Sequence, residues 1–344
     1  MAETGDEFIC LRQELVEQFT DRRQSVTLHK EILQLPAQDG EGGPLGVVRK
    51  HLPGGPTLPP VLLVHGFAQN RYTWHTSERS PSAWLAARGF DVWNMELRGH
   101  GRSTEDVHRG AEKFADYVAD VQRVARAIGQ PAFWIGHSLG GAAVYGAAAE
   151  APELPRGVIG IGAIYTFAQH NRFLRLLGKL TWRLRDVPGV GNLQIRTRLG
   201  GRIAAKLYSL TDITGYTFPV SGWWPGSIEP DLLAERLTRG FDWTSVTVWQ
   251  EMSRWAVTGT FEYDDDWRTA NVPLLVILGD FDHLVPPEDG RAAWERSGSE
   301  DKTLLLLDDF HHDVHWGHLD LVIGTLAMEH VWTPLADWMT ARSL

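Results

Sequence analysis

One serine lies in a pattern that suits covalent catalysis. Ser138 stands in Gly136-His-Ser-Leu-Gly140, which follows the apolar run Ala132–Ile135 and precedes the small-residue stretch Gly141–Ala149. That order predicts a strand, a sharp turn at the serine and then a helix. The two glycines suit such a turn because they have no Cβ to clash with nearby backbone. The first N–H groups of the following helix would face negative charge that develops beside the serine.

A serine hydroxyl is a weak nucleophile until a base accepts its proton, so a histidine and a carboxylate are needed as well. Two carboxylates, Asp280 and Asp282, come directly after the apolar run Leu274–Gly279. Four histidines lie further along the chain, in His311-His-Asp-Val-His-Trp-Gly-His318. Residue type alone leaves both aspartates and several of these histidines as candidates.

The elements that must position these residues alternate between strand and helix. Short apolar runs are typical of strands buried on both faces of a parallel sheet, and segments of helical periodicity separate them. The predicted strands are Val61–Val64, Phe90–Leu97, Ala132–Ile135, Val158–Ala163, Pro273–Leu278 and Thr303–Leu307, and the predicted helices are Ala83–Arg88, Phe114–Ile128, Gly141–Ala149, Arg291–Arg296 and Leu321–Arg342. This order predicts an α/β fold, with a mostly parallel central sheet and helices on both faces.

Two regions depart from that alternation. Near the N-terminus, Phe8, Leu11, Leu15 and Phe19 recur at helical spacing and predict an amphipathic first helix. The strands Val26–Leu35 and Gly46–Leu52 follow, joined as a hairpin by the turn-rich residues 39–44. Between residues 165 and 269 the chain is helical and loop-like, which predicts an inserted cap. Residues 1–164 and 270–344 would then be the two parts of the core.

At the apolar run Leu274–Gly279 and the residues after it, the sequence resembles the α/β-hydrolase family, and the resemblance covers about Val61–Ala163 and Val272–Trp338. Its members often carry Gly-x-x-Asp-x-x-Val-Pro after a strand, and Gly279–Pro286 matches that pattern with Asp282 as the acid. Asp280 is the alternative. His318, in Gly317-His-Leu-Asp, resembles the base of acid-lipase-like and polyester-synthase-like members, with His315 as the alternative.

The resemblance extends to the region around the expected oxyanion. His65-Gly-Phe67 follows a predicted strand, as an H-G-x loop does in relatives, and the block Leu62–Ser103 looks most like acid-lipase-type members. The resemblance implies that the backbone N–H groups of Phe67 and Leu139 stabilise the oxyanion. It also makes Gly136, His137 and Gly140 the turn around the nucleophile.

The family resemblance implies a serine hydrolase that needs no cofactor. Ser138 would attack a small-molecule carboxylic ester, His318 would transfer the proton, and Asp282 would orient His318. The aromatic residues of the insertion favour an apolar acyl chain. Acyl transfer and cleavage of thioesters, amides or lactones are alternatives on the same residues, and a non-catalytic binding protein on this scaffold is another. Dehalogenases and epoxide hydrolases normally have Asp at the nucleophile position, so Ser138 argues against both.

The histidine-rich segment also admits a metal-binding interpretation. His311 and His315 are four residues apart, with Asp313 between them and Asp320 nearby. No cysteine joins them and no H-E-x-x-H pattern is present, so we interpret the segment as a histidine-rich loop and expect no metal.

Composition limits the possible partners. The chain has 344 residues, 43% of them hydrophobic, and a formal net charge of −10, so it has no electrostatic reason to bind nucleic acid. Cys10 is the single cysteine and cannot form an intrachain disulfide. No apolar run approaches the roughly 20 residues that span a bilayer, and the acidic N-terminus does not look like a signal peptide. We therefore expect no stable membrane anchor and a cytoplasmic location.

Overall fold

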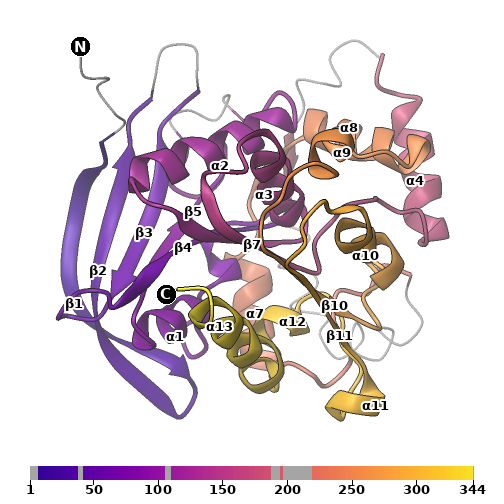
Figure 1. Cartoon of the computed structure of the whole chain (residues 1–344). Helices are drawn as coiled ribbons and strands as arrows, with labels where there is room; N and C mark the ends of the chain where they lie inside the picture. Colours follow the sequence, from indigo (N-terminus) through magenta and orange to yellow (C-terminus); the bar gives the residue numbers. More distant parts are fainter. Residues whose placement is uncertain (1–6, 38–41, 105–109, 187–193, 197–218, 344) are drawn as a thin grey trace.

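A nine-stranded sheet forms the centre of the molecule (Figure 1). The structure is a computed structural model that describes residues 7–37, 42–104, 110–186, 194–196 and 219–343. The strands, in spatial order, are β1 (Ile9–Asp21), β2 (Gln24–Leu35), β3 (Leu45–His51), β5 (Phe90–Met95), β4 (Leu58–Val64), β6 (Ala132–His137), β7 (Pro155–Ile161), β10 (Leu274–Gly279) and β11 (Lys302–Leu307). The pairings from β1 to β5 are antiparallel and those from β5 to β11 are parallel. The predicted mostly parallel sheet is confirmed.

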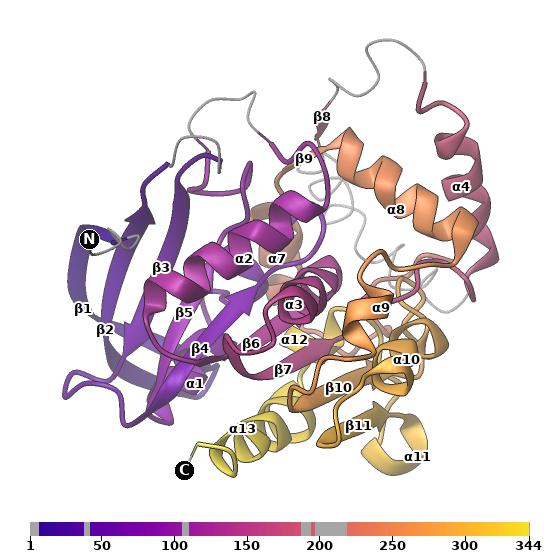
Figure 2. The ribbon, with the colours of Figure 1, turned by 45° about the horizontal axis from the view of Figure 1, so that its top comes forward.

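Helices cover both faces of this sheet (Figure 2). The helices of the core are α1 (Pro81–Ala87), α2 (Ala115–Ile128), α3 (Leu139–Glu150), α10 (Pro287–Arg296), α11 (Asp309–His312), α12 (Asp320–Ile323) and α13 (Thr333–Thr340), with a short 3-10 turn η1 (Arg71–Thr73) and a π-helical turn η3 (Met328–Trp332). Alternate side chains of β4 enter two separate apolar clusters, Leu62 with α2 and α3, and Leu63 with α1 and α13. The core therefore has one apolar layer on each face of the sheet. Within the described ranges, no helix combines the length and apolar content needed to cross a membrane.

The chain between β7 and β10 adds further elements beside the carboxyl ends of the parallel strands. They are α4 (Arg172–Trp182), β8 (Gln194–Arg196), α7 (Pro230–Arg239), β9 (Trp243–Ser245), α8 (Val246–Thr258) and α9 (Asp264–Trp267). Helices α4 and α8 pack closely, since a Cβ on Gly178 would lie 2.7 Å from the Cβ of Ala256. The antiparallel pair β8–β9 was not expected in a segment predicted to be helical and loop-like. The division into core and cap at residues 165 and 269 stays a prediction.

The predicted N-terminal helix is wrong, because this segment is strand β1 at the edge of the sheet. Residues 11, 15 and 19 are four apart, a spacing that satisfies a helical period and also the period of two of a strand. In the structure Leu11, Leu15 and Phe19 are 56, 65 and 43% exposed. Leu15 and Phe19 share one face of β1, and the register shifts at Leu11. Pairing with β2, which follows after a two-residue turn at Arg22 and Arg23, decides between the two conformations.

Several other element boundaries differ from the prediction; for example, β7 begins at Pro155 and α10 at Pro287. The single terminal helix predicted for Leu321–Arg342 is divided, because Gly324 is extended (φ −60°, ψ 154°) and ends α12. Strand β4 begins at Leu58, three residues before the predicted start. The hairpin of β2 and β3 has the expected antiparallel register, while residues 39–41 of its predicted turn lie outside the described residues.

Candidate active site

Ser138 occupies the turn between β6 and α3 in a strained backbone conformation. Its φ of 58° and ψ of −125° are values that residues with a side chain rarely adopt. A Cβ on Gly136 would lie 2.3 Å from the carbonyl oxygen of Gly140, and a Cβ on Gly140 would lie 2.4 Å from the carbonyl oxygen of His65. The N–H of Ser138 donates to the carbonyl oxygen of Ile161 at 3.2 Å, which helps to hold the turn. Glycine is therefore required on both sides of the serine.

His318 and Asp282 form a buried pair beyond the carboxyl ends of β11 and β10. His318 Nδ1 lies 2.6 Å from Asp282 Oδ2, and the two residues are 1 and 2% exposed. The other carboxylate oxygen, Asp282 Oδ1, accepts the backbone N–H groups of Leu284 and Val285 at 2.9 and 2.8 Å. A carboxylate fixed in this way accepts the Nδ1–H of the imidazole, so that Nε2 is left to accept a proton.

Two glycines let the backbone approach the side chains of Asp282, His318 and Ser138 closely. Gly162, directly after β7, has a φ of +50°, and a Cβ there would lie 3.1 Å from Asp282 Oδ2 and 3.2 Å from His318 Nδ1. A Cβ on Gly66 would lie 2.8 Å from the Cβ of Ser138. Gly162 was not predicted to belong to the site, and its position at the end of a buried strand is the signal that could have found it.

A cavity of about 280 Å³ contains both Ser138 and His318 in its lining. Its other lining residues are almost all apolar, which suits the hydrocarbon part of a ligand. Much of the wall comes from the chain between β7 and β10, including Phe167, Trp223, Phe241, Trp249 and Met252. Part of the aromatic content of the insertion thus lies directly beside the serine.

His137 supports the loop that carries His318. Its Nε2 lies 3.1 Å from the carbonyl oxygen of His318, and the two rings are 4.4 Å apart between centroids. Complete burial holds the pKa of His137 well below its ordinary value, and His318 lowers it further. A neutral His137 with its proton on Nε2 can therefore donate a hydrogen bond to the backbone of His318. The sequence placed His137 in the turn and did not indicate this contact.

The alternative residues Asp280 and His315 form a second pair. His315 Nδ1 lies 2.5 Å from Asp280 Oδ2, and Asp280 Oδ1 accepts the backbone N–H of Trp316 at 2.9 Å. The side chain of His315 is 33% exposed, and neither residue lines the cavity beside Ser138. The structure therefore brings His318 to the serine's cavity with Asp282 bonded to it, and leaves Asp280 and His315 outside this arrangement.

Comparison with known proteins identifies the family of the chain. The family model described as "alpha/beta hydrolase fold" matches residues 59–320. The chain belongs to the α/β-hydrolase family.

Individual relatives of this α/β-hydrolase are distant. It is 24% identical over 261 residues to a monoacylglycerol lipase of Mycolicibacterium smegmatis, which covers 74% of this chain and 81% of the lipase. It is 34% identical over 104 residues to epoxide hydrolase B of Mycobacterium tuberculosis, and that match spans only 28% of the length of the epoxide hydrolase. The crystal structure of a monoacylglycerol lipase from Paleococcus ferrophilus superposes with a TM-score of 0.59 at 18% identity, covering 97% of this chain and 100% of the lipase. The finer resemblance to acid lipases stays a prediction.

The two predicted oxyanion donors of this α/β-hydrolase lie close to Ser138. Leu139 is the first residue of α3, so its N–H has no acceptor within the helix. Phe67 lines the cavity and follows Gly66, the residue packed against the Cβ of Ser138. Their role in binding an oxyanion stays a prediction.

Asp320 fastens the His318 loop to the wall of the cavity. It is buried, and its Oδ2 accepts the backbone N–H groups of Gly317 and Trp224 at 2.7 and 2.8 Å. Nearby, the N–H of Leu319 donates to the carbonyl oxygen of Gly222 at 2.7 Å. Burial raises the pKa of Asp320 to about 7, although these N–H groups oppose the shift. The sequence indicated Asp320 only as a neighbour of the histidines.

The structure arranges the possible metal ligands of residues 311–318 differently from the metal-binding interpretation of the sequence. His311 bonds to Asp308 at 2.9 Å. Across the described chain, the group around His315 that could offer three donors consists of Asp280, Asp309 and His315. Neither His311 nor Asp313 belongs to that group, so the structure does not bring together the residues that the metal-binding interpretation named.

Proposed function

We propose that this α/β-hydrolase cleaves carboxylic esters through a covalent acyl-enzyme on Ser138. The observation that carries the proposal is the buried His318–Asp282 pair, at 2.6 Å, whose histidine lines the same cavity as a serine held in a strained turn. A nucleophile, a base and an orienting carboxylate are the groups that acyl transfer requires.

The reaction follows from the roles of these atoms. Ser138 Oγ attacks the carbonyl carbon while His318 Nε2 accepts its proton, and Asp282 stabilises the imidazolium that forms. The backbone N–H groups of Phe67 and Leu139 bind the developing oxyanion, each contributing about 3 kcal/mol in enzymes of this type. The alcohol leaves with the proton from His318. Water then attacks the acyl carbonyl while His318 accepts its proton. The bond to Ser138 Oγ breaks, His318 returns the proton to Ser138, and the carboxylic acid leaves.

The cavity supports esters with an apolar acyl part. Its volume of about 280 Å³ lies near the lower end of the range for ligand pockets, which favours short or medium chains over long ones. Two relatives named monoacylglycerol lipases are compatible with this class of substrate. The partial match to an epoxide hydrolase does not favour epoxide opening here, because Ser138 stands where those enzymes normally have an aspartate.

A series of p-nitrophenyl esters of increasing acyl length, assayed with the wild type and with Ser138→Ala, tests the proposal. We expect a maximum at short or medium length and a loss of at least 10³-fold in kcat for the variant. Adding an alcohol as a competing acceptor distinguishes hydrolysis from acyl transfer. A folded wild type that cleaves none of these esters, or a variant as active as the wild type, contradicts the proposal.

A further inference from the structure

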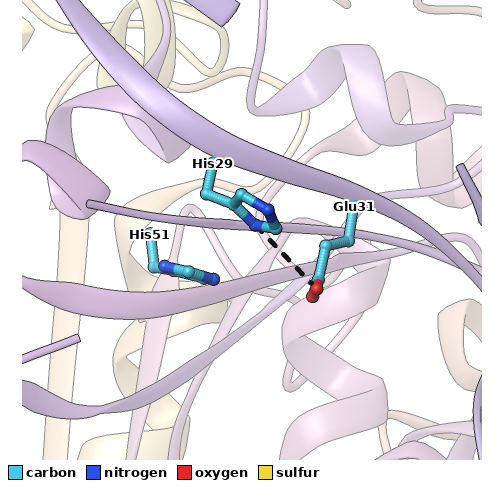
Figure 3. A group of neighbouring side chains, drawn as sticks. All are labelled: His29, Glu31 and His51. Atoms are coloured by element: carbon cyan, nitrogen blue, oxygen red, sulfur yellow. Dashed lines mark ion pairs between the residues drawn. The ribbon is translucent and has the colours of Figure 1, made fainter. Parts of the chain in front are cut away.

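A group of potential metal ligands lies on the antiparallel part of the sheet, away from the cavity. His29 and Glu31 are two residues apart on β2, so their side chains share one face. His51, at the end of β3, is directly opposite His29 in the antiparallel register. Figure 3 shows the three side chains gathered on the same side of these two strands.

The donor atoms of this group are close to one another. One ligand atom from each of His29, Glu31 and His51 lies within 4.8 Å of the other two. His29 Nδ1 is 3.9 Å from Glu31 Oε1, and the two imidazole rings are stacked with centroids 4.9 Å apart. All three residues are partly exposed, so the side chains have room to rotate toward a common centre.

The surroundings leave lone pairs available on each side chain. His51 Nδ1 lies 2.7 Å from the carbonyl oxygen of Leu52, so the proton resides on Nδ1 and Nε2 keeps a free lone pair. His29 Nδ1 is buried and has no hydrogen-bond partner among the described residues. A backbone carbonyl that fixes the tautomer of a histidine in this way is common at metal sites.

The carboxylate of Glu31 is also oriented. Its Oε2 accepts Arg49 Nη1 at 3.1 Å, which leaves Oε1 directed at His29. Arg49 is a positive charge beside the site, but it is neutralised by a two-point contact with Asp91 at 2.8 and 3.0 Å. The arginine therefore positions Glu31 without an uncompensated charge that would repel a cation.

We propose that His29, Glu31 and His51 bind a divalent transition ion of the zinc class and thereby link β2 to β3. Two imidazole nitrogens and one carboxylate oxygen are a donor set that Zn²⁺ and similar ions prefer, whereas Mg²⁺ and Ca²⁺ favour sites made of oxygen. Ion–ligand distances of about 2.0–2.2 Å require the three donors to move together by about an ångström. The exposed side of the group leaves a further position for water.

Titration of the untagged, EDTA-treated chain with ZnCl₂ by calorimetry tests the site, and Co²⁺ absorption reports the coordination. We expect one ion per chain, with Zn²⁺ affinity reduced at least tenfold in His29→Ala and in His51→Ala. In Glu31→Gln the loss should be about tenfold. His315→Ala is the control, because it removes the histidine of the other three-donor group, Asp280–Asp309–His315.

A second readout does not depend on calorimetry. Zn²⁺ should raise the melting temperature of the wild type and of His315→Ala, but not that of His29→Ala or His51→Ala. Unsaturable binding to the wild type overturns the proposal. Loss of binding in His315→Ala with retention in His29→Ala also overturns it, because the ion would then occupy the other group.

Discussion

Replacing Asp282 by asparagine, with Asp280→Asn as the matched control, tests which carboxylate serves the reaction. The asparagine can still accept the N–H groups of Leu284 and Val285 through its Oδ1, so the loop should keep its shape. Its NH₂ group would then face His318 Nδ1 in place of a carboxylate oxygen 2.6 Å away. The imidazole would have to accept that hydrogen bond on Nδ1 and carry its proton on Nε2, where it cannot act as a base.

The expected loss is large because the tautomer, and not only the charge, is wrong. The corresponding replacement in a serine protease lowers kcat by about 10⁴-fold. For Asp282→Asn we expect kcat to fall by about 10³–10⁴-fold, which corresponds to about 4–5.5 kcal/mol of transition-state stabilisation. Asp280→Asn disturbs an equally close pair with His315, at 2.5 Å, that does not line the cavity. Its kcat/KM should stay within about threefold of the wild type.

The assay is steady-state hydrolysis of the best p-nitrophenyl ester, with circular dichroism to confirm that both variants fold. A large fall in kcat with a nearly constant KM is expected for Asp282→Asn. Equal losses in the two variants would refute the assignment of Asp282, and so would an Asp282→Asn enzyme that keeps a third or more of its activity.

Four further predictions concern stability and the surroundings of the site. Gly136→Ala should lower the free energy of unfolding by about 3 kcal/mol or more, because its Cβ would meet backbone 2.3 Å away. Gly54 has open space around it, so the free energy of unfolding of the control Gly54→Ala, measured by urea denaturation, should stay within about 0.5 kcal/mol of the wild type. Burial lowers the pKa of Lys50 to about 7, so the unfolded chain binds more protons than the folded chain between pH 7 and 10. The stability of the wild type should therefore rise with pH in that window relative to Lys50→Met, by roughly 4 kcal/mol in total. Parallel curves of stability against pH for the two proteins would contradict this. Asp320→Ala should lower kcat/KM about tenfold. Asp320→Asn should lower it by less than about threefold, because asparagine can still accept the N–H groups of Gly317 and Trp224. Equal losses in the two variants would refute a role of Asp320 in holding the His318 loop. The raised pKa of Asp320, about 7, means that the folded state binds the extra proton from pH 4 to 7, so this residue should reduce wild-type stability as pH rises through that window and Asp320→Asn should remove that contribution.

The parallel part of the fold could be predicted from the sequence because its strands are buried on both faces. Runs such as Val61–Val64 and Leu274–Leu278 are apolar without interruption, and the strand, turn and helix around Ser138 are adjacent in the chain. Local sequence therefore contains the information that positions the serine. The edge strand β1 was harder to predict from the sequence. Leu11, Leu15 and Phe19 are exposed, and only the pairing with β2 makes their segment a strand.

Sequence spacing limits the partners of Ser138 to a few candidates, but it cannot choose between Asp280 and Asp282 or between His315 and His318. Asp280 and Asp282 lie in one loop, and His315 and His318 lie in another, so each residue could be paired in more than one way. The structure resolves the pairs because the turn after β10 directs Asp282 and Asp280 to different neighbours. The contacts of His137 and Asp320 join segments far apart in the chain, and no local pattern predicts them.

Labelling with a serine-directed phosphonate, followed by peptide mass spectrometry, tests the central claim most directly. The account predicts one adduct per chain, on the peptide that contains Ser138, with ester hydrolysis lost in proportion to labelling. His318→Ala should form the adduct at least 10²-fold more slowly, because no base would then accept the serine proton. Absence of an adduct on the folded chain, or hydrolysis that persists after Ser138 is fully labelled, would contradict the account.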